Sequence, residues 1–266
     1  KVQVGATGIT ASLFNMVSGG QKLSIVADKG REQKGYSSSA LLMRSDLWDG
    51  GAKKIEDLKG KRVGITQTGS TFHYMLGRLL ETKGLKLSDV EVVPLGKLSS
   101  VMAALQGKQV DAVILNEPNI TKMEKAGHGK VVVQVGDAIE YQTSAIFFAP
   151  EFSKNRDAAV RFLAAYIKSC RYYYDATLVK KDGKLAPGAN YEEVVGIIAK
   201  YTGAPAADIK LGLPYMDRDG KLLASDIQTQ IDWYFNHKMI EKKIGADQVV
   251  DGKLWEEALQ KVGAAK

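Results

Sequence analysis

The 266-residue sequence contains one cysteine, Cys170, and three histidines, His73, His128 and His237. A single cysteine excludes an intrachain disulfide and any cysteine-based zinc site. The histidines lie in different segments, and none has a second histidine at the spacing of metal ligands. We therefore expect neither a metal site nor a cofactor.

Long apolar runs and basic stripes are also missing. No apolar run approaches the length of a membrane helix, and no signal peptide is visible, so a secreted origin requires a leader that has been removed. The net charge is +7, but the 37 lysines and arginines are scattered, in pairs such as Lys53 and Lys54. No basic stripe interleaves with aromatics as nucleic-acid grooves require, so we expect no nucleic-acid partner. Apolar content of 45% and charged content of 25% are typical of a globular protein of one or two domains.

The most informative stretch is KRVGITQTGST, residues 61–71. Lys61 to Ile65 has the pattern of a short buried strand, and a turn with Gly69 leads to Ser70 and Thr71, where a helical apolar pattern begins. Such a turn gathers free backbone N–H groups and the positive end of a helix dipole, which together can bind an anion. The alternative is that Ser70 or Thr71 only caps its own helix. A nucleotide-binding P-loop is excluded, because that motif needs a lysine where Ser70 stands.

Strand and helix patterns alternate along the first half of the chain. This rhythm predicts an α/β fold with mostly parallel sheets flanked by helices, whose binding crevice lies beyond the carboxyl ends of the strands. From residue 155 onward the pattern is helical, and Asn190 with Glu193 and Ser225 with Gln228 have capping-box spacing. We expect strands at residues 1–5, 23–27, 61–66, 90–95, 110–115 and 130–135, helices at 9–17, from 70 to about 84 and from 99, a polar loop at 28–35, and extended segments at 39–43 and 143–149.

Three further residues are candidate ligand contacts. Asn116 follows the strand at 110–115, so it should lie at the same sheet edge as the turn before Ser70. Tyr36 and Tyr141 each stand in a polar loop before an extended apolar segment, although simple packing is the alternative for both. The order of residues suggests no Ser–His–Asp set and no pair of acids at catalytic spacing, so no catalytic residue is predicted.

Several segments taken together resemble a known family. In their order they are similar to the substrate-binding proteins of ABC importers that have the type II periplasmic-binding-protein fold, in the group for sulfonates, nitrate and thiamine precursors. The segments are KVQVGATGITASLFN (1–15), LSIVAD (23–28), GYSSSALLMRSD (35–46), IEDLKGKRVGITQTGSTFHYML (55–76), AALQGKQVDAVILNEP (103–118) and DGKLLASDIQTQIDWYF (219–235).

The resemblance implies two α/β lobes joined by crossover strands near 39–43 and 143–149. Lobe 1 would comprise residues 1–45 and 145–266, and lobe 2 residues 46–144. The family normally has two further βα units before the strand at 1–5, so we expect lobe 1 to lack those units in this chain. The resemblance also implies ligand contacts from Thr7, Gly8 and Ile9, from Thr68, Gly69, Ser70 and Thr71, and from Asn116.

The function implied by the resemblance is binding rather than catalysis. A periplasmic solute-binding protein would capture a small polar or anionic organic molecule in a cleft between the lobes and deliver it to the membrane permease of an ABC importer. One alternative is an enzyme on the same bilobal fold, similar to the thiamine-pyrimidine synthases or to the menaquinone-pathway lyases. The synthases use a histidine and a cysteine-rich motif, against which the lone Cys170 argues. Another alternative, the effector domain of a transcription regulator, would need a DNA-binding helix pair that the sequence does not show.

Overall fold

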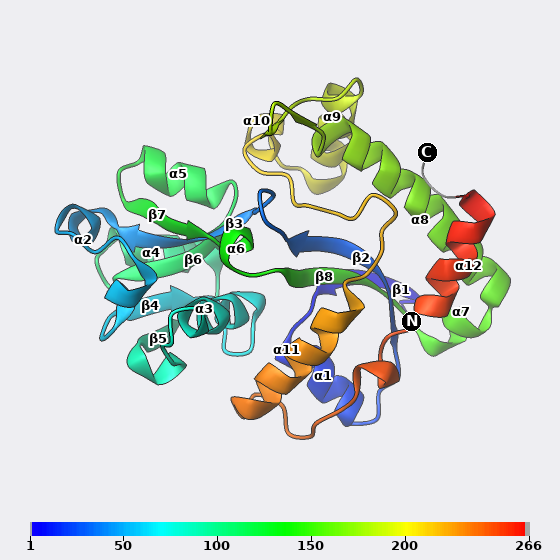
Figure 1. The fold of residues 1–266 in the computed structure, drawn as a ribbon, viewed down its shortest axis with the longest axis horizontal. Coiled ribbons are helices and arrows are strands. Elements are labelled where there is room, and N and C mark those ends of the chain that lie inside the picture. Colours follow the sequence, from blue (N-terminus) through cyan, green and yellow to red (C-terminus); the bar gives the residue numbers. More distant parts are fainter. Residues whose placement is uncertain (1, 264–266) are drawn as a thin grey trace. The chain divides into compact units, whose positions relative to one another are not determined.

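The computed structural model describes residues 2–263, which form two compact units (Figure 1). Unit 1 comprises Lys1–Arg31, Tyr141–Gly203 and Tyr215–Lys266, and unit 2 comprises Glu32–Glu140 and Ala204–Pro214. The chain therefore passes between the units at four points.

Unit 2 contains a five-stranded sheet in the order β5-β4-β6-β3-β7. β4 is parallel to β5 and to β6, while β3 is antiparallel to both of its neighbours, so four of the five strands point the same way. This arrangement confirms the α/β class with a mostly parallel sheet. The elements are β3 (Ser39–Arg44), α2 (Ser45–Asp49), η1 (Ile55–Leu58), β4 (Arg62–Ile65), α3 (Thr71–Glu81), η2 (Leu87–Asp89), β5 (Glu91–Pro94), α4 (Leu98–Gln106), β6 (Ala112–Asn116), α5 (Asn119–Lys125), β7 (Gly129–Gln134), α6 (Val135–Ala138) and α10 (Ala206–Ile209).

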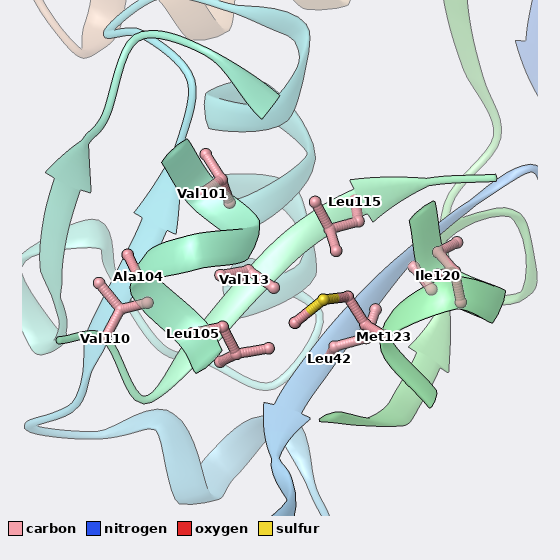
Figure 2. Close-up of a cluster of buried hydrophobic side chains, with 10 residues drawn as sticks. Leu42, Val101, Ala104, Leu105, Val110, Val113, Leu115, Ile120 and Met123 are labelled. Atoms are coloured by element: carbon pink, nitrogen blue, oxygen red, sulfur yellow. The ribbon is translucent and has the colours of Figure 1, made fainter. Parts of the chain in front are cut away.

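Helices α4 and α5 cover one face of this sheet (Figure 2). Alternate residues of β6, Val113 and Leu115, point to this face and pack beneath Leu105 of α4 and Met123 of α5. The period of two in β6 and the period near 3.6 in α4 bring apolar side chains to a common layer. Burial of this layer from water stabilises the sheet and fixes the carboxyl ends of its strands.

Unit 1 is built on a three-stranded sheet in the order β1-β8-β2. On one face, Leu163 and Ile167 of α8 and Leu254 of α12 pack against Phe148 of β8. Phe14 of α1 contacts Tyr234 of α11, with ring centroids 6.1 Å apart. The elements are β1 (Val4–Gly8), α1 (Ala11–Ser18), β2 (Ser24–Glu32), β8 (Tyr141–Phe148), α7 (Pro150–Lys154), α8 (Arg156–Thr177), β9 (Lys180–Lys181), β10 (Lys184–Leu185), α9 (Tyr191–Thr202), α11 (Ala224–Asn236), η3 (Ala246–Gln248) and α12 (Gly252–Val262).

The expected lobe bounds, 1–45 with 145–266 and 46–144, differ from the observed units. The segment 39–43, expected as a crossover, is β3 and lies inside the sheet of unit 2, where Ser39 pairs with Asn116. The segment 143–149 falls almost wholly in β8 of unit 1, and the chain enters that unit at Tyr141. The segment Ala204–Pro214 belongs to unit 2, where Lys122 of α5 and Asp208 of α10 form an ion pair of 2.5 Å.

The expected polar loop at 28–35 is also wrong in its first half, because β2 continues to Glu32. Asp28 is fully buried, and its carboxylate accepts hydrogen bonds from the backbone N–H groups of Gly30 and Asp217. A third hydrogen bond comes from the amide of Gln142, at 2.6 Å. In a sequence, a charged residue such as Asp28 favours the prediction of a loop. In the structure, residues far along the chain supply the hydrogen bonds that its carboxylate needs inside a strand.

Candidate functional site

The carboxyl ends of β4 and β6 lie at one edge of the unit 2 sheet, because these two strands are parallel neighbours. β3 begins at the same edge, where Ser39 pairs with Asn116. We call this region the carboxyl edge. It consists of residues 66–73, Asn116, Ser37–Ser39 and Glu32.

Helix α3 begins at the carboxyl edge, directly after β4. Ser70 is its N-cap, and the Ser70 hydroxyl accepts a hydrogen bond of 3.3 Å from the backbone N–H of His73. Ser70 therefore caps its own helix. The next two backbone N–H groups, those of Thr71 and Phe72, have no acceptor among the described residues. They point out of the first turn of an eleven-residue helix, where the helix dipole favours negative charge.

His73 is a residue of the carboxyl edge that sequence reasoning missed. Its ring is buried, and its Nδ1 accepts a hydrogen bond of 3.1 Å from the N–H of Gly69, which has a φ of +73°. Because Nδ1 accepts, the neutral ring carries its proton on Nε2. His73 thereby holds the left-handed turn that leads into the first turn of α3, where the N–H groups of Thr71 and Phe72 lie. Its position three residues after Ser70 is the signal that could have identified it.

Asn116 ends β6 and is partly buried. Its Oδ1 atom is shielded from solvent and has no hydrogen-bond partner among the described residues. An amide can present either its oxygen or its two N–H donors after a half-turn of the group. The next residue is anchored, because the N–H of Glu117 donates to Ser38 O at 2.9 Å and its carboxylate accepts from Thr121.

Glu32 is a second residue that sequence reasoning missed. Its carboxylate is 1% exposed and accepts hydrogen bonds from the Ser37 hydroxyl at 2.5 Å and from the N–H and hydroxyl of Ser38 at 3.2 Å. Burial raises the pKa of Glu32 above its ordinary value, although the serine hydrogen bonds act in the opposite direction. The Ser37 hydroxyl also accepts from the N–H of Gly136 at 2.9 Å, which ties α6 to this cluster.

The predicted contacts divide between the two units. Thr68, Gly69, Ser70, Thr71 and Asn116 come together at the carboxyl edge, and Tyr36 lies in the loop just before Ser37. Thr7, Gly8, Ile9 and Tyr141 belong to unit 1.

Within unit 1, the end of β1 and β8 lie together. Thr7 is exposed, Gly8 pairs with Ser144 in β8, and the N–H of Ile9 donates to Thr143 O at 3.0 Å. Ile9 as a whole residue is fully buried. Tyr141 is the first residue of β8 and fully buried rather than part of a loop.

The chemistry available at the carboxyl edge is hydrogen bonding by neutral groups. Apart from the buried Glu32, the residues that form it carry no charge. Across residues 2–263, no group of three or more His, Cys, Asp and Glu side chains could hold a metal ion. In the same range, none of the helices combines the length and apolar character needed to span a bilayer.

Known proteins share both sequence and fold with this chain. A binding protein of Brucella abortus is 27% identical over 179 residues, which cover 66% of this chain and 50% of that protein. The chain thus spans about half the length of the curated relatives it first matches. The solved structures that share its fold include the following two. One is named as the periplasmic sulfonate-binding protein SsuA of Methylobacillus flagellatus (TM-score 0.74, 18% identity, 98% of this chain and 76% of that chain). The other is the desulfurization enzyme DSZB (TM-score 0.68, 14% identity, 97% and 85%).

A family model described as NMT1/THI5 like matches residues 40–176. This range includes most of unit 2, with the turn before α3 and Asn116, and continues through β8 into α8. It covers slightly more than half of the chain, and the chain therefore belongs to the NMT1/THI5-like family.

Proposed function

We propose that this protein is a periplasmic solute-binding protein that captures a small organic anion and delivers it to the permease of an ABC importer. The observation that carries the proposal is the pair of N–H groups of Thr71 and Phe72 at the start of α3, which have no acceptor among the described residues. Two aligned donors at a helix N-terminus suit an oxoanion such as a sulfonate, and they need no lysine or arginine. The fold shared with a protein named as sulfonate-binding supports this class of ligand.

Asn116 offers a second contact to the same ligand. Its amide has a shielded oxygen atom with no partner among the described residues, and leaving such an atom unpaired is unfavourable. A ligand that supplies a donor to this oxygen, or an acceptor to the reoriented amide, would satisfy it. The unit 1 residues Thr7, Gly8, Ile9 and Tyr141, together with Tyr36, remain predicted contacts.

Thr71→Pro tests the backbone donors directly. Proline lacks an N–H but is well tolerated at the first position of a helix, and Ser70 before it already has the extended backbone that proline requires (φ −74°, ψ 169°). Loss of a hydrogen bond to a charged group should weaken binding of ethanesulfonate by about 1.5–3 kcal/mol, roughly 10- to 150-fold. Isothermal titration calorimetry measures this change.

Thr71→Ala is the matched control, because it removes the same side chain and keeps the N–H group. Its affinity should stay within about threefold of the wild type, and both variants should melt cooperatively. Equal affinities of the proline and alanine variants would show that the start of α3 does not hold the anion.

The proposal assigns binding without catalysis, although an enzyme, DSZB, shares the fold. Incubation of the protein with ethanesulfonate should return the ligand unchanged by mass spectrometry. Release of sulfite in proportion to protein concentration would instead favour an enzyme.

A further inference from the structure

A cavity of about 450 Å³ lies in unit 1 between α8 and α9, and none of the predicted ligand contacts lines it (Figure 1 shows the two helices). Small-molecule sites commonly have volumes of roughly 300–1,000 Å³. The apolar part of its wall consists of Cys170 and Tyr173 of α8, Val194, Ile197 and Ile198 of α9, and Met216.

The sequence of α8 explains why a space remains. Tyr166, Ser169, Cys170 and Tyr173 follow the spacing of one helix face, so two small residues stand between two large ones. The Ser169 hydroxyl is turned back to Ala165 O of its own helix, at 3.1 Å. On the neighbouring face, a hydrogen bond of 2.7 Å between the Tyr172 hydroxyl and the Glu193 carboxylate joins the two helices.

The wall of this cavity offers little to a polar ligand. The Tyr166 hydroxyl is already bound to Asp28 O at 2.6 Å. Burial raises the pKa of the Cys170 thiol to about 12, so this group is neutral at ordinary pH. Among the described residues that line the cavity, Lys168 is the only charged one, and it is exposed. The cavity is therefore mainly apolar inside, and the Lys168 ammonium lies at its rim.

We propose that the cavity binds a single-chain amphipathic anion, with its hydrocarbon tail between α8 and α9 and its acidic head at Lys168. Burial of the tail supplies the affinity, and each CH₂ group removed from the tail weakens binding about fourfold. The Lys168 ammonium distinguishes an anionic head from a neutral or cationic one. This inference does not depend on the carboxyl edge of unit 2.

The probe is octanoate, below its micellar concentration, with protein labelled by ¹³C-methyl methionine. Titration should shift the methyl signal of Met216, which lines the cavity, and leave those of Met75 and Met123 of unit 2 unchanged. Hexanoate should bind more than tenfold more weakly than octanoate, because it lacks two CH₂ groups. A shift at Met75 or Met123 without one at Met216 would overturn the proposal.

Two pairs of variants locate the head and the tail. Lys168→Gln should weaken octanoate about fivefold and leave 1-octanol unchanged, whereas Lys154→Gln, at an exposed lysine of α7, should alter neither. Ile197→Trp fills the rim and should abolish the Met216 shift, whereas Tyr201→Trp, at a position 80% exposed, should not. All four positions are exposed, so these proteins should fold.

Equal affinity for octanoate, 1-octanol and octylammonium would contradict the role of Lys168 and overturn the proposal. Thr71→Pro protein should bind octanoate as the wild type does. Failure at the carboxyl edge and failure at this cavity can therefore be told apart.

Discussion

Glu32 shows how a single residue makes stability depend on pH. Burial raises the pKa of its carboxyl above the value of 4.5 for an exposed glutamate. The folded protein therefore holds this proton more tightly than the unfolded chain does. The contribution of Glu32 to the free energy of unfolding is fully present below pH 4.5 and is lost as the pH rises through the raised pKa.

The prediction concerns Glu32→Gln, which keeps the shape of the side chain and removes its titration. From pH 4 to 8 the wild type should lose stability relative to this variant, as measured by urea denaturation at each pH. Lys34 is exposed and lies two residues after Glu32, so Lys34→Gln should leave the shape of the wild-type stability profile unchanged. Parallel profiles for the wild type and Glu32→Gln would contradict the assigned pKa direction.

At the scale of elements, α6 lies against the loop that follows β2. A Cβ atom on Gly136 would lie 2.6 Å from the backbone oxygen of Gln33, closer than such contacts allow. The same loop carries Ser37, whose hydroxyl accepts from Gly136 N. The absence of a side chain at Gly136 therefore permits the contact between α6 and the Glu32 cluster.

Gly136→Ala should lower the free energy of unfolding by about 1–3 kcal/mol, because the backbone of Gln33 must move. The matched control is Gly196→Ala in α9, where a Cβ meets nothing within 4 Å. That change should raise stability by about 0.5–1 kcal/mol, since alanine suits a helix interior better. Chemical denaturation compares the two, and a destabilised Gly196→Ala with an unaffected Gly136→Ala would refute this account.

Elements with local signals could be predicted from sequence, and elements with distant partners could not. The strands predicted at 61–66, 90–95, 110–115 and 130–135 are β4 to β7, and Ser70 caps α3 as one interpretation held. The two predicted capping boxes are wrong. Asn190 stands at the N-cap of α9, but its side chain makes no cap hydrogen bond. Ser225 lies inside α11, which already begins at Ala224. Capping-box spacing is a local pattern that the surrounding structure can override.

The candidate site was partly predictable for the same reason. The turn before α3 follows from Gly69 and Ser70, which act within a few residues. Glu32 was missed because its burial is visible only in three dimensions, whereas His73 could have been identified from its position three residues after Ser70. The sequence alone predicts that the carboxylate of Glu32 lies at the surface. The structure shows it buried, with hydrogen bonds from the hydroxyls of Ser37 and Ser38.

At the scale of the whole molecule, each unit has its own apolar core. Leu115 belongs to the core of unit 2 and Leu163 to the core of unit 1, and both are fully buried. The division between the units could not be located from sequence, because β3 has the apolar character of any buried strand. Nor does a local pattern show that Ala204–Pro214 joins unit 2.

Leu115→Ala and Leu163→Ala should each lower the free energy of unfolding by about 2–5 kcal/mol in its own unit. Native-state hydrogen exchange should show faster exchange in β4 and β6 for Leu115→Ala, and in β8 and α8 for Leu163→Ala. Exchange that rises equally in both units for either variant would show one cooperative core instead of two.

The pairing of β1 with β8 has a consequence for synthesis. Val4 lies opposite Phe148, so the partner of β1 is made roughly 140 residues later, which takes on the order of 10–30 s at about 5–20 residues per second. The long segment Glu32–Glu140 of unit 2 is complete before that partner exists. As the chain is made from its N-terminal side onward, the segment Glu32–Glu140 can collapse early, while the segment VGATG waits for β8, the strand it pairs with.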